Sequence, residues 1–302
     1  MFRAQRDDRR DFIGRRWEDD KIRKSRLVPR LAMAVVLADG IRCRDTITDD
    51  AAQRVYHGEI ILLITVFTPK TLSFLRSLKR NNKREWFHAR KDQYDLHCKQ
   101  PMTAVIERLA VDMRSFAPEL IADPKVSLFR QFRDTRFSDD KTPMKTHIAA
   151  TFPNRTLGRM NGAGVYFEIA PTWVWIGGGL WRPDASQLQL VREHIVANHE
   201  QLDAIVKSAR FKKIGGLQGD QMTRVPRGYA KDHPAASYLV HRQFMGFREE
   251  PAAFATGKDF YKQLLATIQT VAPLVQFLNE PLVDALKTDR RAHVFHEDEL
   301  SF

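Results

Sequence analysis

Charged side chains of both signs are concentrated between Arg133 and His147. The stretch holds four lysines and arginines, three aspartates and a histidine. Arginine forms paired hydrogen bonds with phosphate and carboxylate groups, and lysine adds a compact positive charge. We therefore predict an anion site on this stretch. Its basic residues are Arg133, Arg136, Lys141 and Lys145, and the aspartates that would orient them are Asp134 and Asp140.

The same charges fit other interpretations. Opposite charges that face each other across paired strands form ion pairs that set the register, and such a ladder needs no ligand. A metal site on Asp134, Asp139 and Asp140 is a further alternative, as is acid–base chemistry by His147 with an aspartate. The residues leave these alternatives open, and they specify neither a reaction nor a cofactor.

Two other motifs combine polar and aromatic residues. The stretch "WIGGGLWRP" brings Trp181 and Arg182 close to three glycines, which suits the stacking of a planar ring. Aromatic core packing beside a β-bulge explains the same stretch without a ligand. The stretch "RVPRGY" holds Arg227 on a loop with proline and glycine, where it could clamp an anion or form local ion pairs. Arg182 and Arg227 complete the predicted ligand-binding set.

Common catalytic and nucleotide-binding motifs are absent from the sequence. The chain contains no G-x-x-x-x-G-K-[ST], no H-E-x-x-H and no G-x-S-x-G. His194 and His199 are five residues apart, so on a helix they would not share a face. We predict no metal site.

Composition points to a globular protein with a basic balance. Of 302 residues, 43% are hydrophobic, and 49 lysines and arginines exceed 37 aspartates and glutamates, for a net charge of +12. A positive charge favours acidic partners but says nothing about fold. Two cysteines, Cys43 and Cys98, lie outside any C-x-x-C pattern, which excludes a disulfide framework and favours a reducing, cytoplasmic setting.

The ends of the chain differ from its middle. Residues 1–30 hold eleven basic and six acidic residues, and the apolar runs 31–38 and 60–67 are far shorter than the roughly 20 residues of a membrane span. We predict a poorly ordered basic extension over 1–66, such as an over-long gene prediction would produce, and no membrane association. Residues 280–302 are predicted to form a peripheral tail.

Hydrophobic periodicity predicts the elements that must position these residues. Apolar residues repeat with a period typical of helices in the first and last parts of the chain, and with a period of two between those parts. Because neighbouring strands are joined by short turns, we predict an antiparallel sheet flanked by N-terminal and C-terminal helices, an α+β fold. Helices are expected at about 69–80, 84–98, 102–117, 186–206 (interrupted at Asn198) and 258–279, and strands at 126–137, 144–152, 165–170, 173–180 and 241–247.

Several of these stretches resemble one family. The stretches are "FTPKTLSFLRSLKRNNKREWF", "FRQFRDTRFSDDKTPMKTHIAATF", "GGGLWRP", "RVPRGYAKDHPAASYLVHRQF" and "VAPLVQFLN". In order and spacing they resemble the domain-of-unknown-function family 2461 over 67–279. The family pattern R-D-x-R-F-S-x-D-K-x-P-Y-K matches this chain from Arg133 to Lys145, except that Met144 stands where an aromatic residue is usual. The resemblance implies a single domain at 67–279 and supplies no mechanism.

Three functions follow as expectations. The first is the binding of a small phosphorylated or other anionic ligand in a basic pocket at the 129–147 hairpin. The second is nucleic-acid binding by a basic helix face, with residues just beyond it. That face consists of Lys70, Arg76, Arg80, Lys83 and Arg84. The third is an interaction scaffold in which the hairpin charges are structural. The residues do not specify an oligomeric state.

Overall fold

The computed structural model describes residues 67–136, 138–159 and 161–299, with side chains as far as residue 288. The predicted basic extension over 1–66 lies outside the described residues. In the described part of the chain, no helix is both long enough and apolar enough to cross a membrane.

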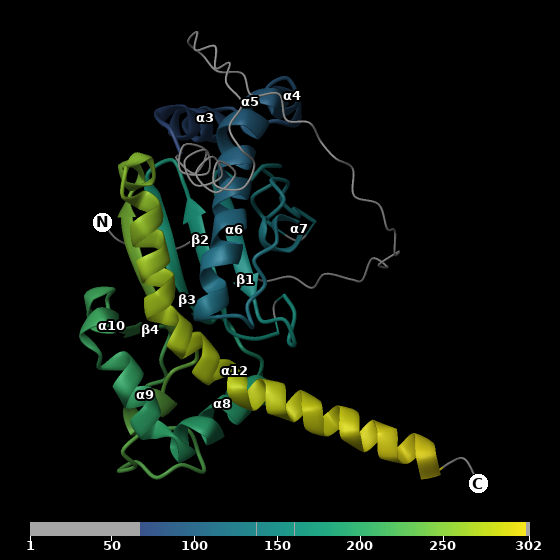
Figure 1. Cartoon of the computed structure of the whole chain (residues 1–302), viewed down its shortest axis with the longest axis vertical. Coiled ribbons are helices and arrows are strands. Elements are labelled where there is room, and N and C mark those ends of the chain that lie inside the picture. The colour runs from purple at the N-terminus through teal and green to yellow at the C-terminus, as the bar shows by residue number, and fades with distance from the viewer. Residues whose placement is uncertain (1–66, 137, 160, 300–302) are drawn as a thin grey trace, which may run out of the picture.

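The described elements run from a helical first half through a sheet to a long final helix (Figure 1). The helices of the first half are α3 (Pro69–Arg80), α4 (Arg84–His88), α5 (Lys91–Tyr94), a π-helical turn at Asp95–Lys99, α6 (Gln100–Asp112), a 3-10 turn at Met113–Ser115 and α7 (Pro124–Ser127). The strands are β1 (Ile148–Pro153), β2 (Gly164–Ile169), β3 (Trp173–Leu180), β4 (Leu217–Gln218) and β5 (Phe244–Pro251). The remaining helices are α8 (Ala185–Ala197), α9 (His199–Val206), α10 (Ala209–Lys213), α11 (Ala236–Leu239), a 3-10 turn at Ala252–Thr256 and α12 (Phe260–Glu299).

All pairs in the five-stranded sheet are antiparallel, in the order β1-β2-β3-β5-β4. The pairing aligns Ile148 with Ile169 and Ile169 with Val174, so the start of β1 lies at the same end of the sheet as the start of β3. Helices precede and follow the strands along the chain, which confirms the predicted α+β class.

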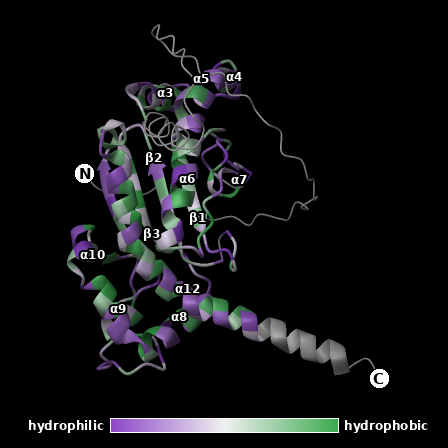
Figure 2. Cartoon of the chain, in the orientation of Figure 1, coloured by the Kyte–Doolittle hydropathy of each residue, from purple (hydrophilic) through white to green (hydrophobic). Residues whose placement is uncertain are grey.

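One face of the sheet forms the core. Along β2, Val165, Phe167 and Ile169 are fully buried, and the residues between them are only partly buried. This alternation arises because α12 packs on β3, β2 and β5 while α6 packs on β1, on the face that Val165 shares (Figure 1). Figure 2 shows hydrophobic and hydrophilic residues alternating around both helices, as a single buried stripe requires. The opposite face carries Tyr166 and Glu168.

The expected strand at 126–137 is not a regular strand, and that prediction was wrong. Helix α7 occupies its start, and only isolated bridges join Leu128 to Ala150 and Phe132 to Met144. The mixed faces of this stretch explain the difference, because charged side chains on both faces cannot lie between a sheet and a helical layer without unpaired burial. The strand expected at 144–152 is likewise regular only from Ile148 onward, as β1.

Several helix boundaries differ from the predicted pattern. The helix expected at 84–98 divides into α4, α5 and the π-helical turn, and the helix expected at 102–117 ends at Asp112, before the 3-10 turn. Asn198 ends α8 and precedes α9, as the sequence predicts. The N-cap of α8 is Asp184, whose carboxylate accepts a hydrogen bond from the backbone N–H of Gln187. Helix α12 continues past residue 279, through a second proline at Pro281, to Glu299.

Candidate functional site

Residues 128–136 and 138–147, called here the hairpin arm, extend from the outer edge of β1. A backbone hydrogen bond joins Phe129 to Ala149 of β1. Two others, from Arg133 to Pro143 and from Lys145 to Gln131, pair the two sides of the arm loosely. The buried Gln131 amide also donates to the Lys145 carbonyl. This pairing divides the charged residues into a group at the tip and a group beside the sheet.

At the tip, charges pair locally at the surface. The Arg136 guanidinium donates to both carboxylate oxygens of Asp134, at 3.1 and 2.8 Å. These hydrogen bonds hold the pKa of Asp134 at about 2. The Lys141 ammonium donates to the Thr135 carbonyl at 3.0 Å. This part of the arm has the local ion pairing that a structural role requires.

Arg133 lies between the tip and the sheet. Its guanidinium donates to the Asp140 carboxylate and, at 2.7 Å, to the Thr142 hydroxyl. Burial raises the pKa of Asp140, but hydrogen bonds from the Thr142 backbone and from Arg133 outweigh it and bring the pKa below its ordinary value. The Asp140 carboxylate and the Thr142 hydroxyl therefore hold the Arg133 guanidinium in place.

Beside the sheet, two cations converge on one aromatic ring, in a group we call the inner cluster (Phe129, Lys145 and Arg159). The Lys145 ammonium nitrogen lies 4.6 Å from the centroid of the Phe129 ring, and the central guanidinium carbon of Arg159 lies 4.2 Å from it. Both are cation–π contacts. The Nη2 atom of Arg159 is buried and has no hydrogen-bond partner among the described residues.

The electrostatics of the inner cluster disfavour positive charge on Lys145. Burial, followed by the nearby positive charges of Arg159, Arg130 and Arg133, lowers the pKa of Lys145 from 10.5 to about 7, and the carboxylate of Glu168 opposes this shift. Lysine in such surroundings can bind an anion when protonated or accept a proton when neutral.

Glu168 forms hydrogen bonds with other polar residues on the sheet face opposite to α12 and α6. Its carboxylate accepts hydrogen bonds from the Tyr166 hydroxyl at 2.6 Å and from the Trp173 indole at 2.9 Å. Burial, and then this carboxylate, raises the pKa of Tyr166 well above its ordinary value. An aspartate was the expected partner of His147 in acid–base chemistry, whereas in the structure the Nε2 atom of His147 lies 3.7 Å from the Glu168 carboxylate.

Sequence reasoning missed Arg159 and Glu168. Arg159 belongs to the loop between β1 and β2, outside every stretch that the charge pattern selected. Glu168 was predicted to lie on a strand, and a charge among the apolar residues of β2 was the one available signal. Neither residue has a spacing relative to Lys145 that predicts contact.

The remaining two predicted residues lie away from the hairpin arm. Arg182 follows β3, so it leaves the sheet at the end opposite to the start of β1, which Lys145 precedes. Arg182 lines a cavity of about 310 Å³. Arg227 is exposed on the loop before Tyr229 and does not line that cavity.

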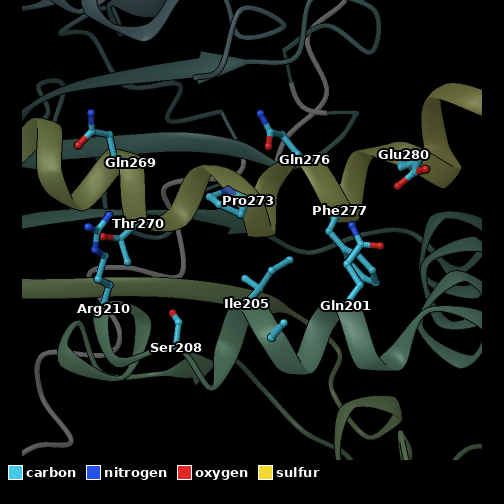
Figure 3. A pocket seen from close by; sticks show the side chains of 11 residues that line it. Gln201, Ile205, Ser208, Arg210, Gln269, Thr270, Pro273, Gln276, Phe277 and Glu280 are labelled. Carbon is cyan, nitrogen blue, oxygen red and sulfur yellow. The ribbon is translucent and has the colours of Figure 1, made fainter. Parts of the chain in front are cut away.

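A larger groove runs between α9, α10 and α12, with a volume of about 660 Å³. Figure 3 shows Pro273 and Gln276 of α12 on one side and Ile205 and Ser208 on the other. Its lining is mixed, and no residue of the hairpin arm contributes to it. Among the described residues, no group of three or more histidines, cysteines or carboxylates could hold a metal ion.

Comparisons with known proteins agree with the motif resemblance. The family model described as "Conserved hypothetical protein (DUF2461)" matches residues 70–277, which include the hairpin arm, the whole sheet and the cavity at Arg182. No curated protein and no solved structure matches the chain. The chain therefore belongs to the domain-of-unknown-function family 2461.

Proposed function

We propose that the protein binds a small phosphorylated or other anionic compound at the inner cluster. The observation that carries the proposal is the convergence of Lys145 and Arg159 on the Phe129 ring. Two partly buried cations so close together repel each other, and their partial burial reduces the screening by water. A bound anion offsets both costs.

The buried Nη2 atom of Arg159 supports the same proposal. A buried guanidinium N–H group without an acceptor costs free energy, and a phosphate or carboxylate oxygen is the acceptor that arginine binds best. A protonated Lys145 would contribute charge to the same anion. Bound phosphate would then raise the pKa of Lys145, and binding would take up a proton near neutral pH.

The other predicted ligand residues have supporting parts in this proposal. Arg133 is held by Asp140 and adds positive charge near Lys145. Arg136, Asp134 and Lys141 shape the tip of the arm through their local hydrogen bonds. A cytoplasmic location, where the free and buried Cys98 would stay reduced, belongs to the same proposal.

A titration with phosphate compounds tests the proposal. Lys145→Met keeps the length of the side chain and its contact with Phe129 but removes the charge, and Arg136→Ala removes an exposed arginine at the tip. We expect thermal stabilisation by phosphorylated compounds to be smaller in Lys145→Met than in wild type and unchanged in Arg136→Ala. Equal stabilisation of both variants and the wild type would refute a site at the inner cluster.

A second candidate function is nucleic-acid binding by the basic face of α3 and the residues that follow it. All five basic residues proposed for this face are exposed, namely Lys70, Arg76, Arg80, Lys83 and Arg84. Phosphate-backbone binding weakens steeply with salt. We expect oligonucleotide affinity to fall between 50 and 200 mM salt by at least about tenfold and to fall further in Arg76→Ala. A salt-independent affinity would contradict this function.

A further inference from the structure

Three arginines converge on the cavity of about 310 Å³ at the end of β3. Arg182 follows β3, Arg192 lies on α8, and Arg242 precedes β5. Burial lowers the pKa of Arg192, Tyr229 opposes the shift, and the positive charge of Arg242 adds to it. Asp220 is the one carboxylate that lines the cavity.

Arg192 is held in place before any ligand binds. Its guanidinium donates to the backbone carbonyls of Leu239 and His241, both at 3.1 Å. Its Nη2 atom also lies 3.9 Å from the sulfur of Met222. A guanidinium fixed by backbone acceptors keeps its remaining N–H groups oriented, so a ligand would bind it at little cost in side-chain entropy.

The arginines of this cavity are not used in ion pairs within the described part of the chain. No carboxylate among the described residues lies within ion-pair distance of Arg182, Arg192 or Arg242. Three positive charges against the single Asp220 leave an excess of two. A phosphate monoester, which carries up to two negative charges near neutral pH, matches that excess.

The backbone at Arg182 adds an independent observation. Its φ angle is 46°, and it is the one non-glycine residue with positive φ in the described chain. A side chain at such a position strains the backbone, and residues kept in strained conformations concentrate at functional sites. A glycine at this position would adopt the same φ without strain but would lack the guanidinium. The strain is therefore a consequence of placing an arginine side chain at the cavity.

We infer that this cavity is a second binding site, separate from the inner cluster, for a small organic phosphate. The phosphoryl group would lie among Arg182, Arg192 and Arg242. The carbon skeleton would contact Pro183, Leu188 and Met222, which supply the apolar part of the lining. The volume suits a compact ligand and lies at the lower end of the range for small-molecule sites.

The test uses phenyl phosphate as the probe, titrated into the full chain by calorimetry at constant ionic strength, with benzyl alcohol as the uncharged control. Arg182→Gly removes a guanidinium and relieves the positive φ. We expect Arg182→Gly to unfold at the same temperature as wild type or higher and to bind phenyl phosphate at least about tenfold more weakly at this site, since a charge-assisted hydrogen bond is lost. Arg242→Ala, which truncates an exposed side chain, should weaken the binding of phenyl phosphate similarly.

Two controls separate this site from the inner cluster. Arg114→Ala, at an exposed arginine in the 3-10 turn Met113–Ser115, should leave binding unchanged. Lys145→Met should leave the affinity of this cavity unchanged, whether or not it abolishes a second binding event. If Arg182→Gly and Arg242→Ala both bind phenyl phosphate like wild type, or if benzyl alcohol binds as tightly as phenyl phosphate, the inference is wrong. Absence of any saturable binding of phenyl phosphate to wild type refutes it as well.

Discussion

Lys145 and Arg159 lie against the same aromatic ring although they come from different segments of the chain. The distances to the centroid of Phe129 are 4.6 Å for the ammonium nitrogen and 4.2 Å for the central guanidinium carbon. Each cation–π contact stabilises its own cation, but the two positive charges repel each other. The ring therefore attracts each cation, while the repulsion between them disfavours positive charge on both at once.

This arrangement predicts an unusual dependence of stability on pH. The pKa of Lys145 is about 7 in the folded protein and near its ordinary value of 10.5 when the chain unfolds. Between these two values the unfolded state binds more protons, so the free energy of unfolding rises with pH, by at most about 1.4 kcal/mol per pH unit. Below pH 7 both states are protonated and the folded state carries the full electrostatic cost.

The measurement is urea unfolding of wild type and Lys145→Met at several pH values from 6 to 9. The difference between the two proteins isolates Lys145 from the other groups that titrate. We expect wild type to gain stability relative to the variant as pH rises above 7. A constant difference over this range would show that Lys145 titrates at its ordinary pKa.

The ion pair at the tip of the arm should contribute little to stability. Arg136 is 74% exposed at its side chain, and its partner Asp134 lies two residues away in sequence. Exposed pairs of this kind contribute about 0–1 kcal/mol. We expect Arg136→Ala to leave the free energy of unfolding nearly unchanged and to raise the pKa of Asp134 from about 2 toward its ordinary value, as NMR titration would measure. A large loss of stability would mean that the tip fixes the register of the arm.

Asn279 should be important for stability because it binds a backbone far from it in sequence. Its side-chain amide accepts a hydrogen bond from the Ala163 N–H at 2.7 Å and donates to the Ala163 carbonyl at 2.9 Å, and both bonds are buried. Asn279→Ala leaves two buried backbone groups without partners, at a cost of about 2–4 kcal/mol. Gln276→Ala, which removes an exposed amide from the same helix, should cost about 0.5–1 kcal/mol. Equal effects in urea unfolding would contradict the importance of burial.

Gly179 illustrates a close approach of two backbones. Its φ is 139°, and a Cβ atom there would lie 1.9 Å from the Phe244 carbonyl oxygen of the neighbouring strand. Gly179→Ala should therefore cost about 2–4 kcal/mol through strain and displaced backbone. Gly158 also has a positive φ, 76°, but open space around its Cβ position, so Gly158→Ala should cost only about 1 kcal/mol. Thermal unfolding of the two variants would show whether the close approach or the dihedral angle dominates.

Local pattern was sufficient to predict much of the fold. The strands at 164–169 and 173–180 and the helix interruption at Asn198 follow from residue spacing, because a period of two or of about 3.6 determines which side chains share a face. The stretch at 126–137 also alternates, and there the prediction of a strand was wrong. Because this stretch carries charged side chains on both faces, it forms an irregular arm beside the sheet. Arg133 lies on one side of that arm and Lys145 lies on the other.

The sequence by itself determined which residues are charged, which faces are apolar, and the family to which the chain belongs. Only the tertiary structure decided which charges meet. Arg159 reaches Phe129, and Glu168 reaches His147, because the pairing of β1 with β2 brings a loop and a strand next to the hairpin arm. That pairing is set by burial of the opposite face against α12 and α6, a long-range requirement that no spacing near Lys145 encodes. The same reason separates Arg182 from the hairpin arm and joins it with Arg192 and Arg242.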